Sequence, residues 1–317
     1  MIHSVSVVIP NYNGLHLLEE YLPSVLAALK HSGADYEIIV SDDASTDDSL
    51  EFLKKNYPLI KTTQSESNKG FSHTANRGIQ LASKTLVLLL NSDIKLKEDY
   101  FSPQWKYFDK PDTFGVMGSI WSEDGTRLMD AAKYPTWKGA QLRSTVNYQF
   151  ADKRSKGCFT LFLSGANALV DRKKLIQLGG FDERYSPYYM EDVDLSVRAW
   201  RNNWKCFYEE ESVCYHKFSE TISKHNSKSL VKRVSRRNKF IFHDIHLEGS
   251  KRATWKTENV LNLLTRWLVL DVDYYRAYSE YKKLIAKTTD KAIFHKTLEE
   301  VVNEILSASN SLKKNLF

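Results

Sequence analysis

The hydrophobic pattern of the first 95 residues alternates between short strand-like runs and longer helix-like periods. The strand-like runs are rich in valine, isoleucine and leucine and cover residues 5–9, 36–40, 59–63 and 86–90. Between them, apolar residues recur every three or four positions, which predicts helices over residues 15–29, 71–82 and a stretch through Phe52 that Ser45 or Thr46 can cap. This alternation predicts a mostly parallel sheet in an α/β fold, with right-handed crossovers.

The run Leu86–Leu90 stands out because its five consecutive apolar residues predict a strand that is buried on both faces. It ends in Asn91, Ser92 and Asp93, and ligands of open α/β sheets bind outside the carboxyl ends of the strands. A carboxylate in this place suits a divalent cation that bridges to phosphates, so we hypothesise that Asp93 binds the metal–diphosphate of an activated sugar. The alternative is a plain turn, for which Asn-Ser-Asp is also suitable.

The rest of the chain carries further strand and helix patterns and then becomes helical. Strands are predicted over residues 114–121, 159–163, 168–170, 205–209 and 212–215, and helices over residues 100–108, 171–179 and 191–200. Beyond about residue 225, helices are predicted around Leu230–Ile245, over residues 260–285 as one long aromatic-rich helix, and over residues 297–306. We therefore expect a domain over residues 1–225 and a C-terminal helical region over residues 226–317.

Composition fits a globular protein of a reducing compartment. Hydrophobic residues are 42% and charged residues 26% of the 317 residues. The three cysteines lack a C-x-x-C spacing, which argues against a disulfide scaffold or a zinc site. We find no signal-peptide pattern at the N-terminus and no uncharged apolar run near the roughly 18 residues that a membrane helix needs. These observations lead us to expect a cytoplasmic protein.

The net charge of +6 is concentrated in one segment. Between Lys217 and Lys256, 11 Lys and Arg residues face 3 Asp and Glu residues, a local charge of +8. Such a segment is a solvated helix face, an anionic-lipid contact or a nucleic-acid contact. The solvated face is the default interpretation, and we expect no nucleic-acid partner.

Acidic residues cluster at the start of the helix predicted over residues 191–200. Glu191 and Asp192 are adjacent and point about 100° apart, so they cannot serve the same contact. The aromatic and proline-rich segment before them can raise the pKa of a carboxylate toward that of a useful base, although the helix dipole also explains acids in a first turn. Asp194 is expected to pair with Arg198, one helical turn away. His216 follows a strand and is a structural histidine or, beside a second ligand, a metal ligand.

Seven motifs occur in an order that resembles family 2 glycosyltransferases. They are Val8–Gly14, Val40–Asp47, Asn68–Phe71 with Asn76–Gly78, Leu90–Asp93, Gly180–Glu183, Met190–Asp194 and Tyr215–Lys217. None of them is decisive alone, but seven in order are highly specific, and the resemblance covers about residues 4–240. The chain is most similar to the rhamnosyltransferase-like branch that builds bacterial surface polysaccharides.

The resemblance implies a GT-A fold, residues 1–225 as the catalytic domain, and inverting transfer of a sugar from a nucleotide-diphosphate sugar to a hydroxyl of a glycan or lipid-linked acceptor. It implies a divalent metal, Mg or Mn, with Asp93 and His216 as its ligands. Asp192 would be the catalytic base, and Glu191 would orient the substrate or the helix. The implied donor-binding residues are Pro10 and Tyr12 at the nucleotide, Asp43 at the base N–H, Gly70, Asn76 and Arg77 along the ribose and diphosphate, and Asn91 with Ser92.

The chain departs from the family pattern at Asn91, where the more common motif begins with Asp. An asparagine can still hydrogen-bond a ribose hydroxyl, but it carries no charge. Two other functions remain open: a sugar-1-phosphate nucleotidyltransferase and a non-catalytic module that binds glycans or lipid surfaces. The first normally carries a glycine-rich loop with a basic residue after the first strand, and Asn11–Gly14 has no such residue.

The C-terminal helical region has three possible partners. It can pack on the catalytic domain, form a homodimer through its helices, or rest on an anionic membrane. A basic face and an apolar-aromatic stripe suit the last of these, so peripheral contact with the inner face of the cell membrane is a secondary expectation.

Overall fold

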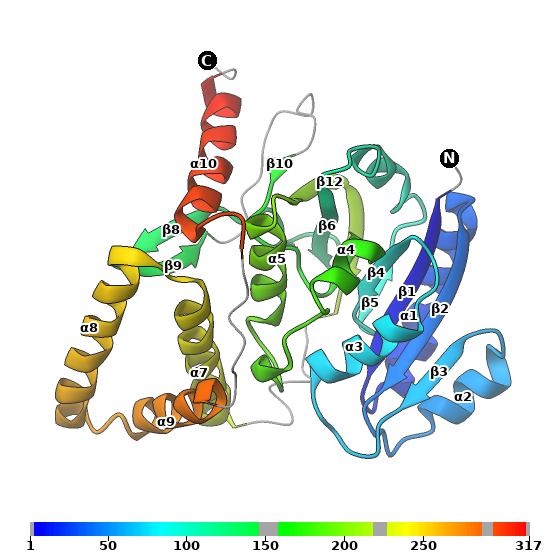
Figure 1. Ribbon diagram of the computed structural model, residues 1–317. Coiled ribbons are helices and arrows are strands. Elements are labelled where there is room, and N and C mark those ends of the chain that lie inside the picture. The colour runs from blue at the N-terminus through cyan, green and yellow to red at the C-terminus, as the bar shows by residue number, and fades with distance from the viewer. Residues whose placement is uncertain (1–2, 146–157, 218–226, 287–293, 315–317) are drawn as a thin grey trace.

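The computed structural model describes residues 3–145, 158–217, 227–286 and 294–314. A large sheet forms its centre, with helices on both faces and a group of helices beside it (Figure 1). The strands of this sheet run in the order β10-β12-β6-β11-β4-β1-β2-β3, with β5 paired to β12 and β7 paired to β6. The strands are β1 Ser4–Asn11, β2 Asp35–Asp42, β3 Lys61–Gln64, β4 Leu86–Leu90, β5 Ile94–Leu96, β6 Thr113–Ser122, β7 Leu128–Asp130, β8 Pro135–Lys138, β9 Gln141–Ser144, β10 Cys158–Phe159, β11 Asn167–Asp171 and β12 Lys205–His216.

The half of the sheet formed by β3, β2, β1 and β4 is parallel, as the sequence predicted. Alternate residues of β1, β2 and β4 enter two different cores, and helices α1 (Leu15–Ser32) and α3 (Phe71–Leu81) pack in one core each. A strand that is covered on both faces needs apolar residues at every position, which explains the uninterrupted run of β4.

The other half of the sheet brings the ends of distant strands together. Strand β11 is antiparallel to both β4 and β6, so β4 and β6 run in the same direction, and β12 is parallel to β6. The carboxyl ends of β4 and β12 therefore lie at the same edge of the sheet. Strand β5 pairs with the end of β12 and sets Ile94 opposite His216.

Helices follow the strands and then form the C-terminal region. They are α2 Ser49–Asn56, α4 Arg172–Gln177, α5 Glu191–Arg201, α7 Lys228–His246, α8 Gly249–Thr265, α9 Val272–Ala286 and α10 Leu298–Lys314, with 3-10 helices at η1 Ser102–Tyr107, η2 Glu183–Tyr185 and η3 Arg266–Val269. Figure 1 shows α7, α8 and α9 as three sides of a frame beside the part of the molecule that contains the large sheet. The boundary expected at residue 225 lies outside the described residues. Across the described part of the chain, no helix combines the length and the apolar character that crossing a membrane requires.

The prediction of one long helix over residues 260–285 is wrong. Helix α8 ends at Thr265, and after η3 the chain reverses at Leu270, whose φ is +50°. The side chain of Asp271 accepts a hydrogen bond from the Tyr274 backbone N–H at 3.1 Å and so begins α9. It also pairs with Arg236 of α7 at 3.0 Å. The break depends on this contact between helices, and no glycine or proline marks it in the sequence.

Other predicted boundaries shift for local reasons. Helix α2 begins at Ser49 with Asp48 at the N-cap position, so neither Ser45 nor Thr46 caps it, and the Ser45 hydroxyl donates to Asp42. The strand expected over residues 59–63 begins at Lys61, since Leu59 is 95% exposed. Residues 100–108 form only the short 3-10 helix η1, residues 159–163 contribute only β10, and residues 205–215 form one strand with a register irregularity.

Candidate active site

Asp93 and His216 meet at the carboxyl edge of the sheet, although 123 residues separate them. The Asp93 Oδ2 and His216 Nε2 atoms are 3.0 Å apart, and their side chains are 11% and 17% exposed. Strand β4 delivers Asp93, and the pairing of β5 with β12 brings His216 to it. The structure thus brings together the two side chains that we expected to be ligands of one metal ion.

The loops after β1 and β2 lie beside this edge. Tyr12 is 38% exposed, and Pro10 is half-buried. Asp43 is almost fully buried, and its carboxylate accepts hydrogen bonds from the backbone N–H groups of Lys69 at 3.0 Å and Gly70 at 2.8 Å. The carboxylate of Asp43 therefore fixes the loop before α3, and any contact with a base would use its remaining lone pairs.

Gly70 ties that loop to the segment that precedes α5. Its φ is +90°, and a Cβ atom at this position would lie 2.6 Å from the Cα atom of Pro187. The N–H of Phe71 donates to the Pro187 carbonyl at 3.1 Å. Only glycine combines this backbone conformation with so close an approach.

Asn76 and Arg77, predicted to lie along the ribose and diphosphate, use their polar groups inside the protein. The Asn76 amide donates to the Phe181 carbonyl and accepts from the Phe181 N–H, both at 2.8 Å. The Arg77 guanidinium donates to the Ser65 hydroxyl at 2.5 Å and to the Asp42 carbonyl at 2.6 Å. These contacts support a structural role for both residues, which their helix position alone could not reveal.

The motif Leu90–Asp93 is held by a neighbouring loop. The N–H of Asn91 donates to the Ala166 carbonyl at 3.1 Å, and the side chains of Asn91 and Ser92 are half-buried. A Cβ atom built on Gly165 would lie 3.7 Å from the Cβ atom of Asp192. The segment around Gly165 therefore connects the end of β4 with the start of α5.

Glu191 and Asp192 occupy the first turn of α5 in different surroundings. Glu191 is 8% exposed, and burial, followed by the charge of Asp192, raises its pKa to about 8. Burial also raises the pKa of Asp192, while N–H groups of Val193 and Gly165 and the charge of Lys133 oppose this shift. Both carboxyl groups thus move in the direction that the aromatic segment before α5 predicted.

Asp194 forms the salt bridge that the sequence predicted. Its Oδ2 atom is 2.6 Å from Arg198 Nε, and its Oδ1 atom accepts from the Tyr185 hydroxyl at 3.1 Å and contacts His246 Nε2 at 2.9 Å. These contacts, led by the charge of Arg198, overcome burial and keep the pKa of Asp194 well below its usual range. Asp194 therefore anchors α5 to α7.

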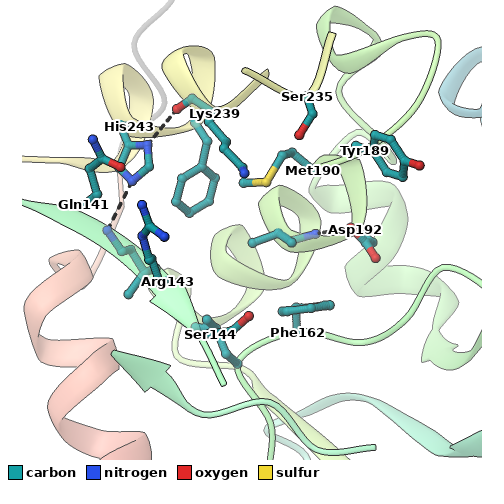
Figure 2. Close-up of a pocket in the computed structure, with 14 residues that line it drawn as sticks. Gln141, Arg143, Ser144, Phe162, Tyr189, Met190, Asp192, Ser235, Lys239 and His243 are labelled. Carbon is teal, nitrogen blue, oxygen red and sulfur yellow. Dashed lines mark hydrogen bonds between the residues drawn. The ribbon is translucent and has the colours of Figure 1, made fainter. Parts of the chain in front are cut away.

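Asp192 lines a cavity of about 430 Å³ between α5, α7 and β9 (Figure 2). Tyr189, Met190 and Phe162 form apolar and aromatic walls near Asp192, and Arg143 and Lys239 lie toward the other side. Asp93 and His216 do not line this cavity. The predicted site residues thus fall into an Asp93–His216 pair at the sheet edge and Asp192 at the cavity, with Glu191 next to Asp192 on α5 but not in the cavity lining.

Comparison with known proteins identifies the family. A family model described as Glycosyl transferase family 2 matches residues 6–179, which is more than half of the chain. The chain belongs to glycosyl transferase family 2. It is therefore a glycosyltransferase, and neither of the two other functions left open by the sequence is favoured.

The curated relatives of this glycosyltransferase are distant. TuaG of Bacillus subtilis (strain 168), provisionally named for teichuronic acid biosynthesis, is 24% identical over 260 residues, which cover 79% of this chain and 92% of TuaG. The N-acetylglucosaminyl-diphospho-decaprenol L-rhamnosyltransferase of Mycobacterium tuberculosis is 24% identical over 228 residues, which cover 64% of this chain and 73% of that enzyme.

Solved structures confirm the predicted GT-A fold. GalNAc-T7 with UDP, GalNAc and Mn²⁺ has a TM-score of 0.66 at 16% identity, covering 98% of this glycosyltransferase and 58% of the longer GalNAc-T7 chain. TarS of S. aureus in complex with UDP-GlcNAc has a TM-score of 0.57 at 17% identity, covering 89% of this chain and 81% of that chain.

The glycosyltransferase has two side chains suited to a divalent cation. A carboxylate and an imidazole in contact, both reachable from solvent, are the donor types that Mn²⁺ accepts, and Mg²⁺ accepts the carboxylate. Within the described residues, no group of three or more His, Cys, Asp or Glu side chains could hold a metal ion. A cation at Asp93 and His216 would thus need diphosphate or water oxygens, which fits a nucleotide-sugar enzyme.

Two residues beside the candidate site gave no signal in the sequence. Lys133 is buried, and its charge opposes the rise in the pKa of Asp192, while burial lowers the pKa of Lys133 to about 8. Asn238 of α7 is fully buried, and its amide donates to the Tyr188 carbonyl at 2.9 Å and the Tyr189 carbonyl at 2.8 Å. Lys133 lies in a stretch without a clear pattern, and Asn238 lies in a helix with no motif, so neither gave a signal.

Proposed function

We propose that this protein is an inverting glycosyltransferase of bacterial surface polysaccharide synthesis. It moves a sugar from a nucleotide-diphosphate sugar to a hydroxyl of a glycan or lipid-linked acceptor. The observation that carries the proposal is the Asp192 carboxylate, which lines a cavity large enough for a sugar and has a raised pKa. The relatives named for teichuronic acid biosynthesis and for rhamnosyl transfer to a lipid diphosphate support this assignment.

The donor would bind at the carboxyl edge of the sheet. Pro10 and Tyr12 would line the nucleotide pocket, and Asn91 and Ser92 would contact the ribose or the sugar. Asp93 and His216 would hold Mg²⁺ or Mn²⁺, which neutralises the charge that grows on the diphosphate as it leaves. Neighbouring structures solved with nucleotide or nucleotide-sugar and Mn²⁺ support a donor of this class.

The Asp192 carboxylate would act as the base on the acceptor. It takes the proton of the acceptor hydroxyl while the oxygen forms a bond to the sugar carbon and the bond from that carbon to the diphosphate breaks. A direct displacement from the opposite face inverts the configuration, so one carboxylate suffices. Burial and the charge of Asp192 raise the pKa of Glu191, which favours its protonated form and so limits the negative charge next to this base.

The test is Asp192→Asn, which keeps the shape of the side chain and removes the base. We expect the transfer rate to fall by roughly 10²–10⁴ while the affinity for a UDP-, GDP- or dTDP-sugar with Mn²⁺ stays the same. The exposed Asp109 supplies the matched control, since Asp109→Asn makes the same change away from the cavity. Transfer by Asp192→Asn at nearly the wild-type rate would show that the base is assigned wrongly.

The helical region over residues 226–317 would hold the enzyme at an anionic membrane on its cytoplasmic side. Eight large apolar residues of the corner between α8 and α9 are exposed, at 54–82%: Val260, Leu261, Leu264, Trp267, Leu268, Val269, Leu270 and Val272. Their density is unusual for a surface, and the basic residues of α7 and α8 suit anionic headgroups. We propose that a lipid surface is the partner of this apolar corner.

Sedimentation with vesicles that contain anionic lipid tests this contact. We expect binding at low salt that weakens at high salt, and loss of binding in Leu264→Glu with Leu268→Glu. Leu59→Glu is the control, because Leu59 is 95% exposed but lies far from the corner, near β3. Absence of binding at low salt, or a stable homodimer that covers the apolar corner, would exclude the membrane contact.

A further inference from the structure

A second cavity adjoins the one that contains Asp192. It has a volume of about 350 Å³, and its lining residues come from β9, α7, α8, η3 and α9. Five residues line both cavities: Gln141, Arg143, Ser235, Lys239 and His243. A ligand that reaches Asp192 through the first cavity can therefore extend into the second.

The lining of the second cavity is strongly positive. No Asp or Glu is among its lining residues. The charged side chains that line it are all basic, namely Arg143, Lys232, Arg236, Lys239 and Arg266. Arg236 and Arg266 both pair with Asp271, at 3.0 and 2.8 Å, which fixes their guanidinium groups. Within the described part of the chain, no acidic side chain forms an ion pair with Arg143, Lys232 or Lys239.

The cations are held close together by the fold. Partial burial, followed by the charges of Arg143 and Arg236, lowers the pKa of Lys239. Arg143 comes from β9 and Lys239 from α7, and both side chains line the first and the second cavity (Figure 2). The positive charges of Arg143, Arg236 and Lys239 repel each other. An anion bound between them would offset this repulsion, so the cluster is suited to an anionic ligand.

His243 sets the spacing between these two elements. The N–H of Leu142 donates to His243 Nε2 at 3.1 Å, and His243 Nδ1 lies 2.6 Å from the Lys239 carbonyl (Figure 2). The first contact makes Nε2 an acceptor, so the ring is neutral and Nδ1 donates. Burial lowers the pKa of His243 to about 4, in agreement with a neutral ring. His243 therefore joins β9 to α7 without adding charge.

We propose that the second cavity binds a phosphate or diphosphate group of the acceptor, while Asp192 receives the proton of the acceptor hydroxyl. This inference rests on the proposed function, because it names the class of acceptor for the same site. The hydroxyl and the anionic group of one acceptor would occupy the two joined cavities. A neutral glycan would bring no negative charge to Arg143, Lys232 and Lys239 of this lining. The anionic group belongs to a lipid diphosphate or to a soluble phosphate, and the experiment below separates these sources.

Inorganic pyrophosphate is the probe, with EDTA present so that no divalent cation assists binding at Asp93 and His216. Calorimetry on the full chain should show binding that weakens with salt. Arg143→Gln with Lys239→Gln should lower the affinity at least about tenfold, because each lost charged hydrogen bond is worth about that factor. Lys54→Gln with Lys55→Gln on α2 makes the same change of charge on an exposed, distant helix and should leave the affinity unchanged.

Two further measurements complete the test. Binding of a nucleoside diphosphate with Mn²⁺ should be the same in the wild type and the Arg143/Lys239 variant, which also shows that the variant is folded. An alkyl diphosphate that binds more tightly than pyrophosphate identifies a lipid source, and equal affinities identify a soluble one. Unchanged pyrophosphate affinity in the variant would overturn the inference and leave the proposed function standing. Absence of nucleoside diphosphate binding with Mn²⁺ would overturn the proposed function instead.

Discussion

The substitution Glu191→Gln tests the electrostatics of the first turn of α5. Glu191 is 8% exposed, and its pKa rises from 4.5 to about 8 on folding. Below pH 4.5 the folded and unfolded chains both bind this proton, but between pH 4.5 and about 8 only the folded chain does so. The free energy of unfolding therefore falls as pH rises across this window, by at most about 1.4 kcal/mol per pH unit.

Asp192 takes part in the same titration, so we expect the contribution of Glu191 to fall by roughly 2 to 4 kcal/mol between pH 5 and pH 8. Glutamine keeps the shape of a protonated glutamate and cannot ionise. Urea unfolding of the wild type and Glu191→Gln at pH 5, 6.5 and 8 measures the effect as a difference, in which other titrating groups cancel. The variant should lose less stability than the wild type as pH rises.

The exposed Glu51 of α2 supplies the control, since Glu51→Gln makes the same chemical change in water and should follow the wild type. Parallel curves for the wild type and Glu191→Gln would refute the reasoning, because they would mean that Glu191 has the same pKa in the folded and unfolded chains. A variant that loses more stability than the wild type at pH 8 would mean that the ionised carboxylate is the stabilised form.

Three further predictions follow from the same contacts. Gly70→Ala should destabilise the protein by about 1–3 kcal/mol in urea unfolding, because the new Cβ atom meets Pro187 at a positive φ; an unchanged midpoint would mean that the loop moves freely. Asp194→Asn should lower the unfolding free energy by about 3–5 kcal/mol through loss of a buried partner of Arg198, and a thermal midpoint within one degree of wild type would contradict this. Asp93→Asn, like EDTA on the wild type, should remove the stabilisation by UDP with Mn²⁺ in a thermal-shift assay, whereas retained stabilisation would exclude Asp93 as a ligand.

Much of the α/β half was predictable because its signals are short-range. The apolar runs, the helical periods and the Asp171 side chain that accepts from Lys174 N–H act within a few residues. The salt bridge between Asp194 and Arg198 follows from one helical turn. The break between α8 and α9 was missed because it depends on the pairing of Asp271 with Arg236 of α7, 35 residues away in the chain.

The candidate site was only partly predictable for the same reason. The types of the residues and the order of the motifs in the sequence indicated Asp93, Asp192 and His216 as site residues. The 3.0 Å contact between Asp93 and His216, however, depends on the register in which β5 pairs with β12, which the sequence does not reveal. The family resemblance placed Asn76 along the ribose and diphosphate, and nothing near Asn76 in the sequence indicates its contact with Phe181, 105 residues away.

The sequence by itself determined the strand–helix alternation, the family and the residue types available at the carboxyl edge of the sheet. Only the tertiary structure decided which of these residues meet, and it alone created the two joined cavities from β9, α5 and the helices after residue 226. The physical reason is one of range. Periodicity and capping act over one or two turns of chain, whereas a cavity depends on how elements more than a hundred residues apart pack against each other.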